Sequence, residues 1–280
     1  MSLKTEKCLI TSLSVLLLVS CNVLSKNETA ASEVFDDADR PEFIKDKAGD
    51  FYLCKPWNYD KPTNAERKYP LFVYLHGGGG SGSPSSLPCF TKNDDKKTYP
   101  CFVYVPHAPG RWDNTLLIQQ IENLKTSYRI DRNRIYLMGY SMGGSGSYAL
   151  ANRYYDHNGH LFAGIVRMAG QSQTTVRNAI ADKTSIWYHL GLSDAPRRIQ
   201  VAEDAYKFLK EYPKNSTARE TSKPFPNKNH PGTTLTLTMN TIEIVKFTRY
   251  DSPVGHNISH IPLTDPYLLK WLFDQSLEKR

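Results

Sequence analysis

Short apolar runs alternate with amphipathic stretches from about residue 50 to residue 278. The runs are rich in β-branched and aromatic residues, as expected of strands buried on both faces of a sheet. Strands are predicted at 51–55, 71–75, 101–105, 135–138, 162–168, 184–190 and 242–250, and helices at 115–128, 144–151, 203–210 and 265–277. This alternation predicts an α/β fold with a mostly parallel central sheet flanked by helices.

The first twenty residues have the pattern of an export signal. Lys4 and Lys7 precede an apolar run at 13–19 that is too short to span a bilayer as a permanent helix. The residues LVSC at 18–21 resemble the lipobox of bacterial lipoproteins, in which Cys21 would be lipidated. The protein is then expected to be exported and anchored to a membrane facing the periplasm or the cell surface. An ordinary signal peptide with a nearby cysteine is the alternative.

Residues 21–40 are polar and lack a hydrophobic period, which predicts a flexible tether. Residues 41–280 are long enough for one sizeable domain with a well-buried core. The net charge of +7 is spread thinly along the chain, with no basic stripe interleaved with aromatic residues. Nucleic acid is therefore not an expected partner.

The stretch IYLMGYSMGGSGSYALA at 135–151 carries the strongest chemical signal. An apolar strand leads into G-x-S-x-G, and small residues then begin a helix, as in a nucleophile elbow centred on Ser141. A serine on such a strained turn requires small neighbours two positions away, because larger side chains would collide. The N–H of Met142 would meet a developing oxyanion. A glycine-rich turn without chemistry is the alternative.

A glycine run follows the predicted strand at 71–75, in the sequence HGGGGSG at 76–82. Backbone N–H groups in such a run can approach a ligand closely, so Gly78 is the expected second oxyanion donor, with Gly79 close behind. A phosphate-binding loop is the competing interpretation. It is disfavoured because no G-K-[ST] sequence follows.

Two further residues complete a possible Ser-Asp-His order. Asp194 follows the predicted strand at 184–190 and could hold the tautomer of a catalytic histidine, or could instead cap the next helix. His256 follows the last predicted strand and is the expected base. His260, four residues later, would suit a helical metal pair, but no acidic partner motif accompanies it. No metal or organic cofactor is expected.

Several positions admit two interpretations. Trp112, on a loop after the strand at 101–105, could line an acyl or sugar pocket or pack the loop onto the domain. Gln171 follows another strand and is a second candidate for substrate binding.

The polar stretch 212–241 could be a lid or a surface excursion with a hairpin at 233–239. Among Cys54, Cys89 and Cys101, a Cys89–Cys101 bridge would close a small loop, but the pairing stays open.

The succession YPLFVYLHGGGGSG, YPCFVYVP, IDRNRIYLMGYSMGGSGSYALA, GLSD and VGHN resembles the α/β-hydrolase superfamily. More narrowly, it is similar to feruloyl and acetyl-xylan type carbohydrate esterases and to related lipoprotein esterases, which share features with polyester depolymerases. The resemblance covers about residues 50–278. It implies that Ser141 is the nucleophile, Asp194 the acid and His256 the base, with Gly78 and Met142 donating to the oxyanion.

The chain departs from the family pattern near the acid. The histidine-glycine pair that often precedes the acid is changed to HLG at 189–191, and the residues after it read APRR at 195–198. The stretch before His256 is also longer than usual. These departures bear on the acid and the substrate pocket more than on the nucleophile.

The expected function is that of a serine carboxylic-ester hydrolase that works through an acyl-enzyme. The resemblance implies acyl or feruloyl esters of polysaccharides, or of their fragments, as substrates. Three alternatives stay open: a serine peptidase with the same triad, a polyester depolymerase, and a non-catalytic carbohydrate-binding relative.

Overall fold

A computed structural model describes residues 42–45, 49–79, 87, 93–172, 176, 178–263 and 265–280. All of them belong to one compact unit, Phe35–Arg280. The predicted signal at 1–20, the lipidated Cys21, the tether at 21–40 and Cys89 lie outside the described residues and stay predictions. Within the described ranges, no helix is both long enough and apolar enough to cross a bilayer.

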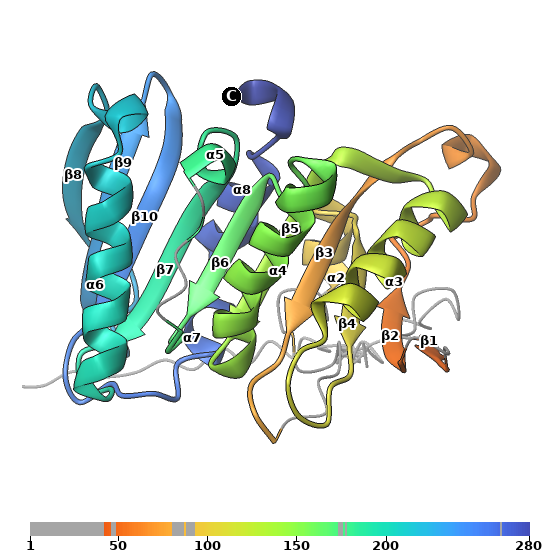
Figure 1. Cartoon of the computed structure of the whole chain (residues 1–280). Coiled ribbons are helices and arrows are strands. Elements are labelled where there is room, and N and C mark those ends of the chain that lie inside the picture. The colour runs from red at the N-terminus through yellow and green to blue at the C-terminus, as the bar shows by residue number, and fades with distance from the viewer. Residues whose placement is uncertain are drawn as a thin grey trace, which may run out of the picture. The chain divides into compact units, whose positions relative to one another are not determined.

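Ten strands of the described chain form one mixed sheet in the order β1-β2-β4-β3-β5-β6-β7-β10-β9-β8 (Figure 1). The central strands run parallel: β4 (Phe102–Pro106), β3 (Tyr69–Leu75), β5 (Ile130–Tyr140), β6 (Gly164–Met168), β7 (Ser185–Gly191) and β10 (Ile242–Tyr250). Antiparallel strands form both edges: β1 (Glu42–Ile44) with β2 (Phe51–Cys54), and β9 (Gly232–Met239) with β8 (Arg219–Pro224). The predicted mostly parallel sheet is confirmed.

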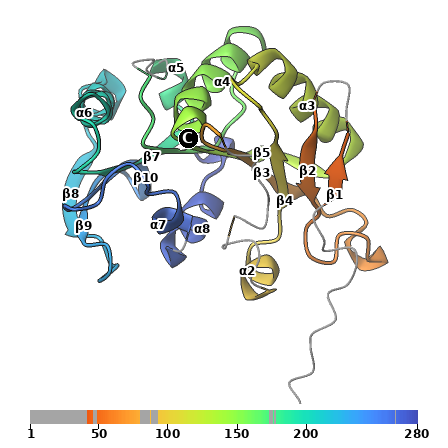
Figure 2. The ribbon, with the colours of Figure 1, turned by 90° about the horizontal axis from the view of Figure 1, so that it is seen from below.

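Helices cover both faces of the sheet (Figure 2). One face carries α3 (Asn114–Ser127), α4 (Met142–Asn158), α5 (Asn178–Ala181) and α6 (Pro196–Lys210). The other carries α2 (Asn93–Thr98), α7 (His260–Leu263) and α8 (Pro266–Phe273). Short 3-10 turns lie at Pro62–Asn64, Pro213–Asn215 and Leu277–Lys279.

An apolar core fills each side of the sheet. Alternate residues of β3 enter opposite cores, with Leu71 and Val73 on the side of α3 and α4, and Phe72 and Tyr74 on the side of α8. Both faces of the central strands are therefore buried. This explains why these strands read in the sequence as unbroken apolar runs.

The polar stretch 212–241 extends the sheet and is not a lid. β9 pairs antiparallel with β10, which confirms the hairpin alternative, and β8 pairs with β9. β8 has the sequence RETSKP and is almost wholly exposed. It was not predicted because an edge strand with two solvent-exposed faces carries no apolar pattern. The predicted helix at 265–277 is also shorter, since α8 ends at Phe273.

Candidate active site

Ser141 lies between β5 and α4 in a backbone conformation that side-chain-bearing residues rarely adopt, with φ at 53° and ψ at −108°. A Cβ on Gly143 would lie 1.9 Å from the carbonyl oxygen of Leu75, and a Cβ on Gly139 would lie 2.2 Å from that of Gly143. The predicted steric need for glycine on both sides of the serine is confirmed. The turn presents Ser141 at the start of a helix, as in a nucleophile elbow.

His256 reaches Ser141 from the loop after β10. Its Nε2 lies 2.9 Å from the Oγ of Ser141. The hydroxyl of Tyr140 donates to the backbone carbonyl of His256 at 3.1 Å, and the two rings lie 5.4 Å apart. The N–H of Ser193 donates to the carbonyl of Val254 at 2.8 Å, which ties the loop after β7 to the loop that carries His256. The imidazole is therefore held by contacts from two neighbouring elements.

Asp194 contacts the other side of the imidazole. Its Oδ2 lies 2.9 Å from the Nδ1 of His256, while its Oδ1 accepts hydrogen bonds from the N–H of Ala195 at 2.7 Å and from Arg198 at 2.9 Å. Burial by itself raises the pKa of Asp194, but the hydrogen bonds from His256, Ala195 and Arg198 outweigh it and lower the pKa below the usual 3.8. Asp194 is therefore charged at neutral pH and can accept a hydrogen bond from the protonated Nδ1 of His256.

Asp194 is not the N-cap of α6, which was its alternative role, but it lies directly before that cap. The N-cap of α6 is Ala195, which has no side-chain capping bond. The Oδ1 of Asp194 does accept the N–H of Ala195, one residue later. The carboxylate thus satisfies a backbone donor at the helix start while its second oxygen faces His256.

The two predicted oxyanion donors lie on segments that border Ser141. Met142 is the first residue of α4, so its N–H has no acceptor within the helix. Gly78 lies in the loop after β3, and a Cβ on the preceding Gly77 would lie 3.5 Å from the Cβ of Ser141. The space beside Gly78 and Gly79 is open, because an added Cβ would meet nothing within 4 Å. Their roles as donors stay predictions.

No family model matches the chain, and no curated protein matches it. Solved structures do match. A thermostable esterase is 23% identical with a TM-score of 0.62, over 85% of this chain and 63% of that one. An acetyl xylan esterase from Aspergillus awamori is 16% identical with a TM-score of 0.60, over 84% and 99%. A ferulic acid esterase is 12% identical with a TM-score of 0.51, over 78% and 90%.

The chain has the α/β-hydrolase fold. It spans 63% of the length of the thermostable esterase, which is less than two thirds. In this fold, the loops after the parallel strands β5, β7 and β10 meet at one edge of the sheet. That edge is where open α/β sheets place their ligand sites, and it is where Ser141, Asp194 and His256 come together.

Trp112 packs behind the glycine loop of the α/β-hydrolase fold. Its ring lies 4.7 Å from that of His76, and a Cβ on Gly146 of α4 would lie 2.7 Å from the Cδ1 of Trp112. Its Nε1 is buried and has no hydrogen-bond partner among the described residues. These contacts fit the packing alternative. A contact between Trp112 and substrate stays a prediction.

Gln171 is exposed on the loop after β6 and is linked to Asp194 through Arg198. Its Oε1 accepts a hydrogen bond from Arg198 at 3.1 Å, and its N–H donates to the Oγ of Ser145 at 3.0 Å. Arg198 therefore bridges Gln171 and Asp194 with its two terminal nitrogens. A direct contact between Gln171 and substrate stays a prediction.

His260 does not share a site with His256. It begins α7, and its ring packs against that of His230 with centroids 5.4 Å apart. Nowhere in the described ranges do three or more histidine, cysteine or acidic side chains gather closely enough to hold a metal ion.

Sequence reasoning missed the role of His76. The ring is buried, its Nδ1 donates to the carbonyl of Gly77 at 2.7 Å, and its Nε2 accepts the N–H of Ala108 at 3.2 Å. Burial lowers the pKa of His76, so the ring is neutral and can accept and donate at once. His76 thus joins the glycine loop after β3 to the loop after β4. Its place at the start of the glycine run was the only signal.

Arg198 was also missed, although a signal was present. It stands four residues after Asp194, near the start of α6, and acid and base side chains at that spacing can meet on one helix face. The sequence could not show that the same carboxylate would also face His256.

Proposed function

We propose that this protein is a serine carboxylic-ester hydrolase. One observation carries the proposal: the Oγ of Ser141 and the Oδ2 of Asp194 each lie 2.9 Å from a different nitrogen of His256. A serine, a base and an orienting acid in series form the arrangement that activates a hydroxyl for acyl transfer. The elbow conformation of Ser141 supports the same function.

The proposed cycle begins when His256 takes the proton of Ser141 as the oxygen attacks an ester carbonyl. Asp194 keeps the proton on Nδ1 and stabilises the imidazolium without taking the proton. The N–H groups of Gly78 and Met142 would hold the negative oxygen of the tetrahedral intermediate. His256 then protonates the leaving alcohol. Water, activated by His256, releases the acid from the acyl-enzyme.

Esters of polysaccharides are the proposed substrates. Two of the solved structures with this fold are an acetyl xylan esterase and a ferulic acid esterase, and the sequence motifs resemble the same class. At 16% and 12% identity, these similarities support the substrate class but not a particular acyl group or sugar.

Labelling with a fluorophosphonate, together with p-nitrophenyl acetate and methyl ferulate turnover, tests the proposal. We expect Ser141→Ala to abolish labelling and to lower turnover at least about 1000-fold, because the nucleophile is lost. Ser216→Ala, at an exposed serine far along the chain, is the matched control and should label normally. A wild-type protein that takes no label, or a labelled Ser141→Ala variant, would overturn the proposal.

We also propose export and lipid anchoring through Cys21, on the basis of the sequence alone. Metabolic labelling with a palmitate analogue tests it in a bacterial host. Label on the wild type and none on Cys21→Ser is the expected result. Equal labelling of both would contradict lipidation at this residue.

A further inference from the structure

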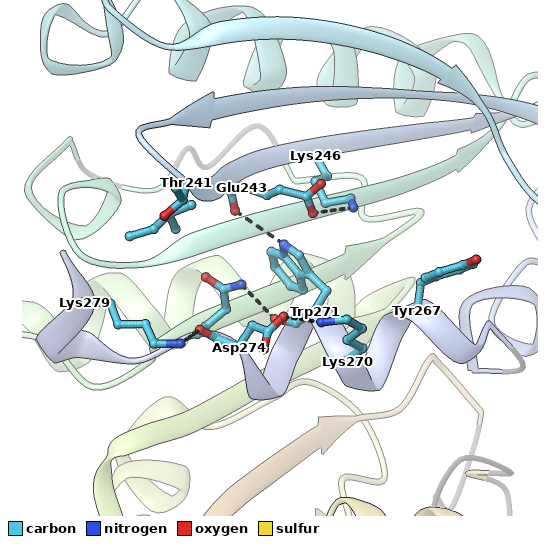
Figure 3. Close-up of a pocket in the computed structure, with 10 residues that line it drawn as sticks. Thr241, Glu243, Lys246, Tyr267, Lys270, Trp271, Asp274 and Lys279 are labelled. Atoms are coloured by element: carbon cyan, nitrogen blue, oxygen red, sulfur yellow. Dashed lines mark hydrogen bonds and ion pairs between the residues drawn. The ribbon is translucent and has the colours of Figure 1, made fainter.

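A long groove lies on the sheet face that carries α8. It consists of two adjoining cavities of about 610 and 360 Å³, which share Glu243, Lys246 and Tyr267 as lining residues. We call it the β10 groove. Figure 3 shows its larger part, with Tyr267 and Trp271 on α8 opposite Glu243 and Lys246 on β10. The groove belongs to neither the triad nor the glycine loop.

One wall is a row of hydroxyl groups on neighbouring strands. Thr221 of β8 lies opposite Thr236 of β9, which lies opposite Lys246 of β10, and all three side chains line the groove. Thr234 of β9 also lines it. The lining residues on β10 run from Ile242 to Lys246, which is roughly 13 Å of strand. A polar face is ordinary on an antiparallel edge, so this wall alone does not indicate a ligand.

Asp265 supplies the observation that indicates a ligand. The residue is only 7% exposed and lines the groove. Its Oδ1 accepts the N–H of Tyr267 at 2.9 Å, but its Oδ2 is buried and has no hydrogen-bond partner among the described residues. A buried oxygen without a partner is costly, and a ligand hydroxyl would supply the missing donor.

The charges of the groove nearly balance, because its lining holds four lysines (Lys223, Lys246, Lys270, Lys279) and three acids (Glu243, Asp265, Asp274), and two of the lysines are ion-paired. Lys246 lies 2.7 Å from Glu243, and Lys270 lies 2.9 Å from Asp274. Paired groups attract an ionic ligand weakly but keep spare donors and acceptors for hydroxyl groups. The ligand that fits is therefore polar and uncharged.

Aromatic rings complete the lining. Tyr267 is 56% exposed although it is a large aromatic residue, and Trp187 lies at the floor beneath Lys246, whose Nζ is 4.4 Å from the ring centre. Trp271 donates its Nε1–H to the carbonyl of Glu243 at 3.4 Å, which holds α8 against β10. An exposed ring beside hydroxyl groups suits a ligand with both apolar C–H faces and hydroxyls.

We propose that the β10 groove binds a neutral oligosaccharide. Sugar hydroxyls donate to Asp265 and exchange hydrogen bonds with the threonine row, while a sugar face packs on Tyr267. The inference extends the proposed function. It rests on that function only in assuming that the bound glycan carries the ester. Binding itself requires neither Ser141 nor turnover, so the two proposals can fail separately.

The test titrates xylohexaose into the full-chain Ser141→Ala protein and follows the indole N–H signals of Trp187 and Trp271 by NMR. We expect both signals to shift with a Kd of about 1 mM or tighter. Tyr267→Ala should weaken binding at least about tenfold, because the stacking face is lost. Phe208→Ala removes an exposed ring from α6 on the opposite face and should bind as before.

Three results would overturn the proposal. The first is no shift of either indole signal at 10-fold above that Kd, roughly 10 mM. The second is unchanged affinity in Tyr267→Ala with the fold intact by circular dichroism. The third is tighter binding of hexagalacturonate than of xylohexaose, which would identify an acidic ligand. Asp265→Asn offers a second check: its amide oxygen can keep the bond from Tyr267, while an NH₂ donor replaces Oδ2, so binding should also weaken.

Discussion

Arg198 holds the carboxylate oxygen of Asp194 that His256 leaves unoccupied. Its Nη1 lies 2.9 Å from Oδ1, while the Nδ1 of His256 lies 2.9 Å from Oδ2. The carboxylate is thereby fixed from both sides, and the bond from Arg198 contributes to the lowered pKa of Asp194. In the proposed mechanism Arg198 is a positioning residue, because it acts on His256 only through Asp194.

Arg198→Gln tests this relationship. We expect kcat/KM for p-nitrophenyl acetate to fall about tenfold, in line with the loss of one charge-assisted hydrogen bond at a partly exposed site. The loss should fall on kcat with KM nearly unchanged, because Arg198 acts on His256 through Asp194 and does not touch the substrate. Arg197→Gln, at the exposed neighbouring position, is the control. A kcat equal to that of the wild type, or a loss confined to KM, would show that Arg198 does not position the acid.

His76→Phe separates ring packing from hydrogen bonding at the glycine loop. The phenyl ring can keep the contact with Trp112 but neither donates to Gly77 nor accepts from Ala108. The loop that carries Gly78 then loses its link to the neighbouring loop, and kcat should fall about 10- to 100-fold with KM within about twofold. His157→Phe, at an exposed histidine near the end of α4, is the control. A rise in KM with unchanged kcat would argue against a role in the oxyanion site.

Gly143→Ala should damage the fold itself. Its new Cβ would lie 1.9 Å from the carbonyl oxygen of Leu75, and neither backbone segment can move without displacing β3 or α4. We expect a loss of about 3 kcal/mol or more in unfolding free energy, or no soluble protein. Gly110→Ala, where an added Cβ meets nothing within 4 Å, should be nearly neutral. Thermal melting of both variants tests this prediction, and equal melting temperatures would contradict the close packing of Gly143 against Leu75.

His189 should make the protein less stable as pH falls. The ring is buried, its Nδ1 hydrogen-bonds with the hydroxyl of Tyr250 at 2.8 Å, and burial, aided by Lys246, lowers its pKa well below 6.5. Below pH 6.5 the unfolded chain takes up a proton that the folded chain does not. The unfolding free energy should therefore fall as pH decreases from 7 to 5, by up to about 1.4 kcal/mol per pH unit from this residue.

Urea denaturation at several pH values measures this slope. His189→Gln should lower the slope, because the replacement cannot titrate, whatever it does to the stability at pH 7. His157→Gln, at an exposed histidine, should keep the wild-type slope. An unchanged slope in His189→Gln would place the pH dependence elsewhere. His76 is the next candidate, since burial lowers its pKa too.

The sequence predicted the parts of the fold that depend on local pattern. The buried central strands read as apolar runs because both their faces meet a core. The turn at Ser141 could be predicted because glycine is required wherever backbone approaches backbone. β8 could not be predicted, because an exposed edge strand has no apolar period. The bridge from His76 to Ala108 could not be predicted either, because a hydrogen bond from a side chain to a distant backbone group produces no sequence pattern.

By itself, the sequence determined which residues can form a strained serine turn and which runs must be buried, because both depend on neighbours along the chain. Only the tertiary structure decided that Ser141 and His256, 115 residues apart, lie at hydrogen-bond distance. Strand order and the loops after β7 and β10 set that distance. The β10 groove likewise exists only where α8 packs opposite β8, β9 and β10, since no single segment encloses a cavity.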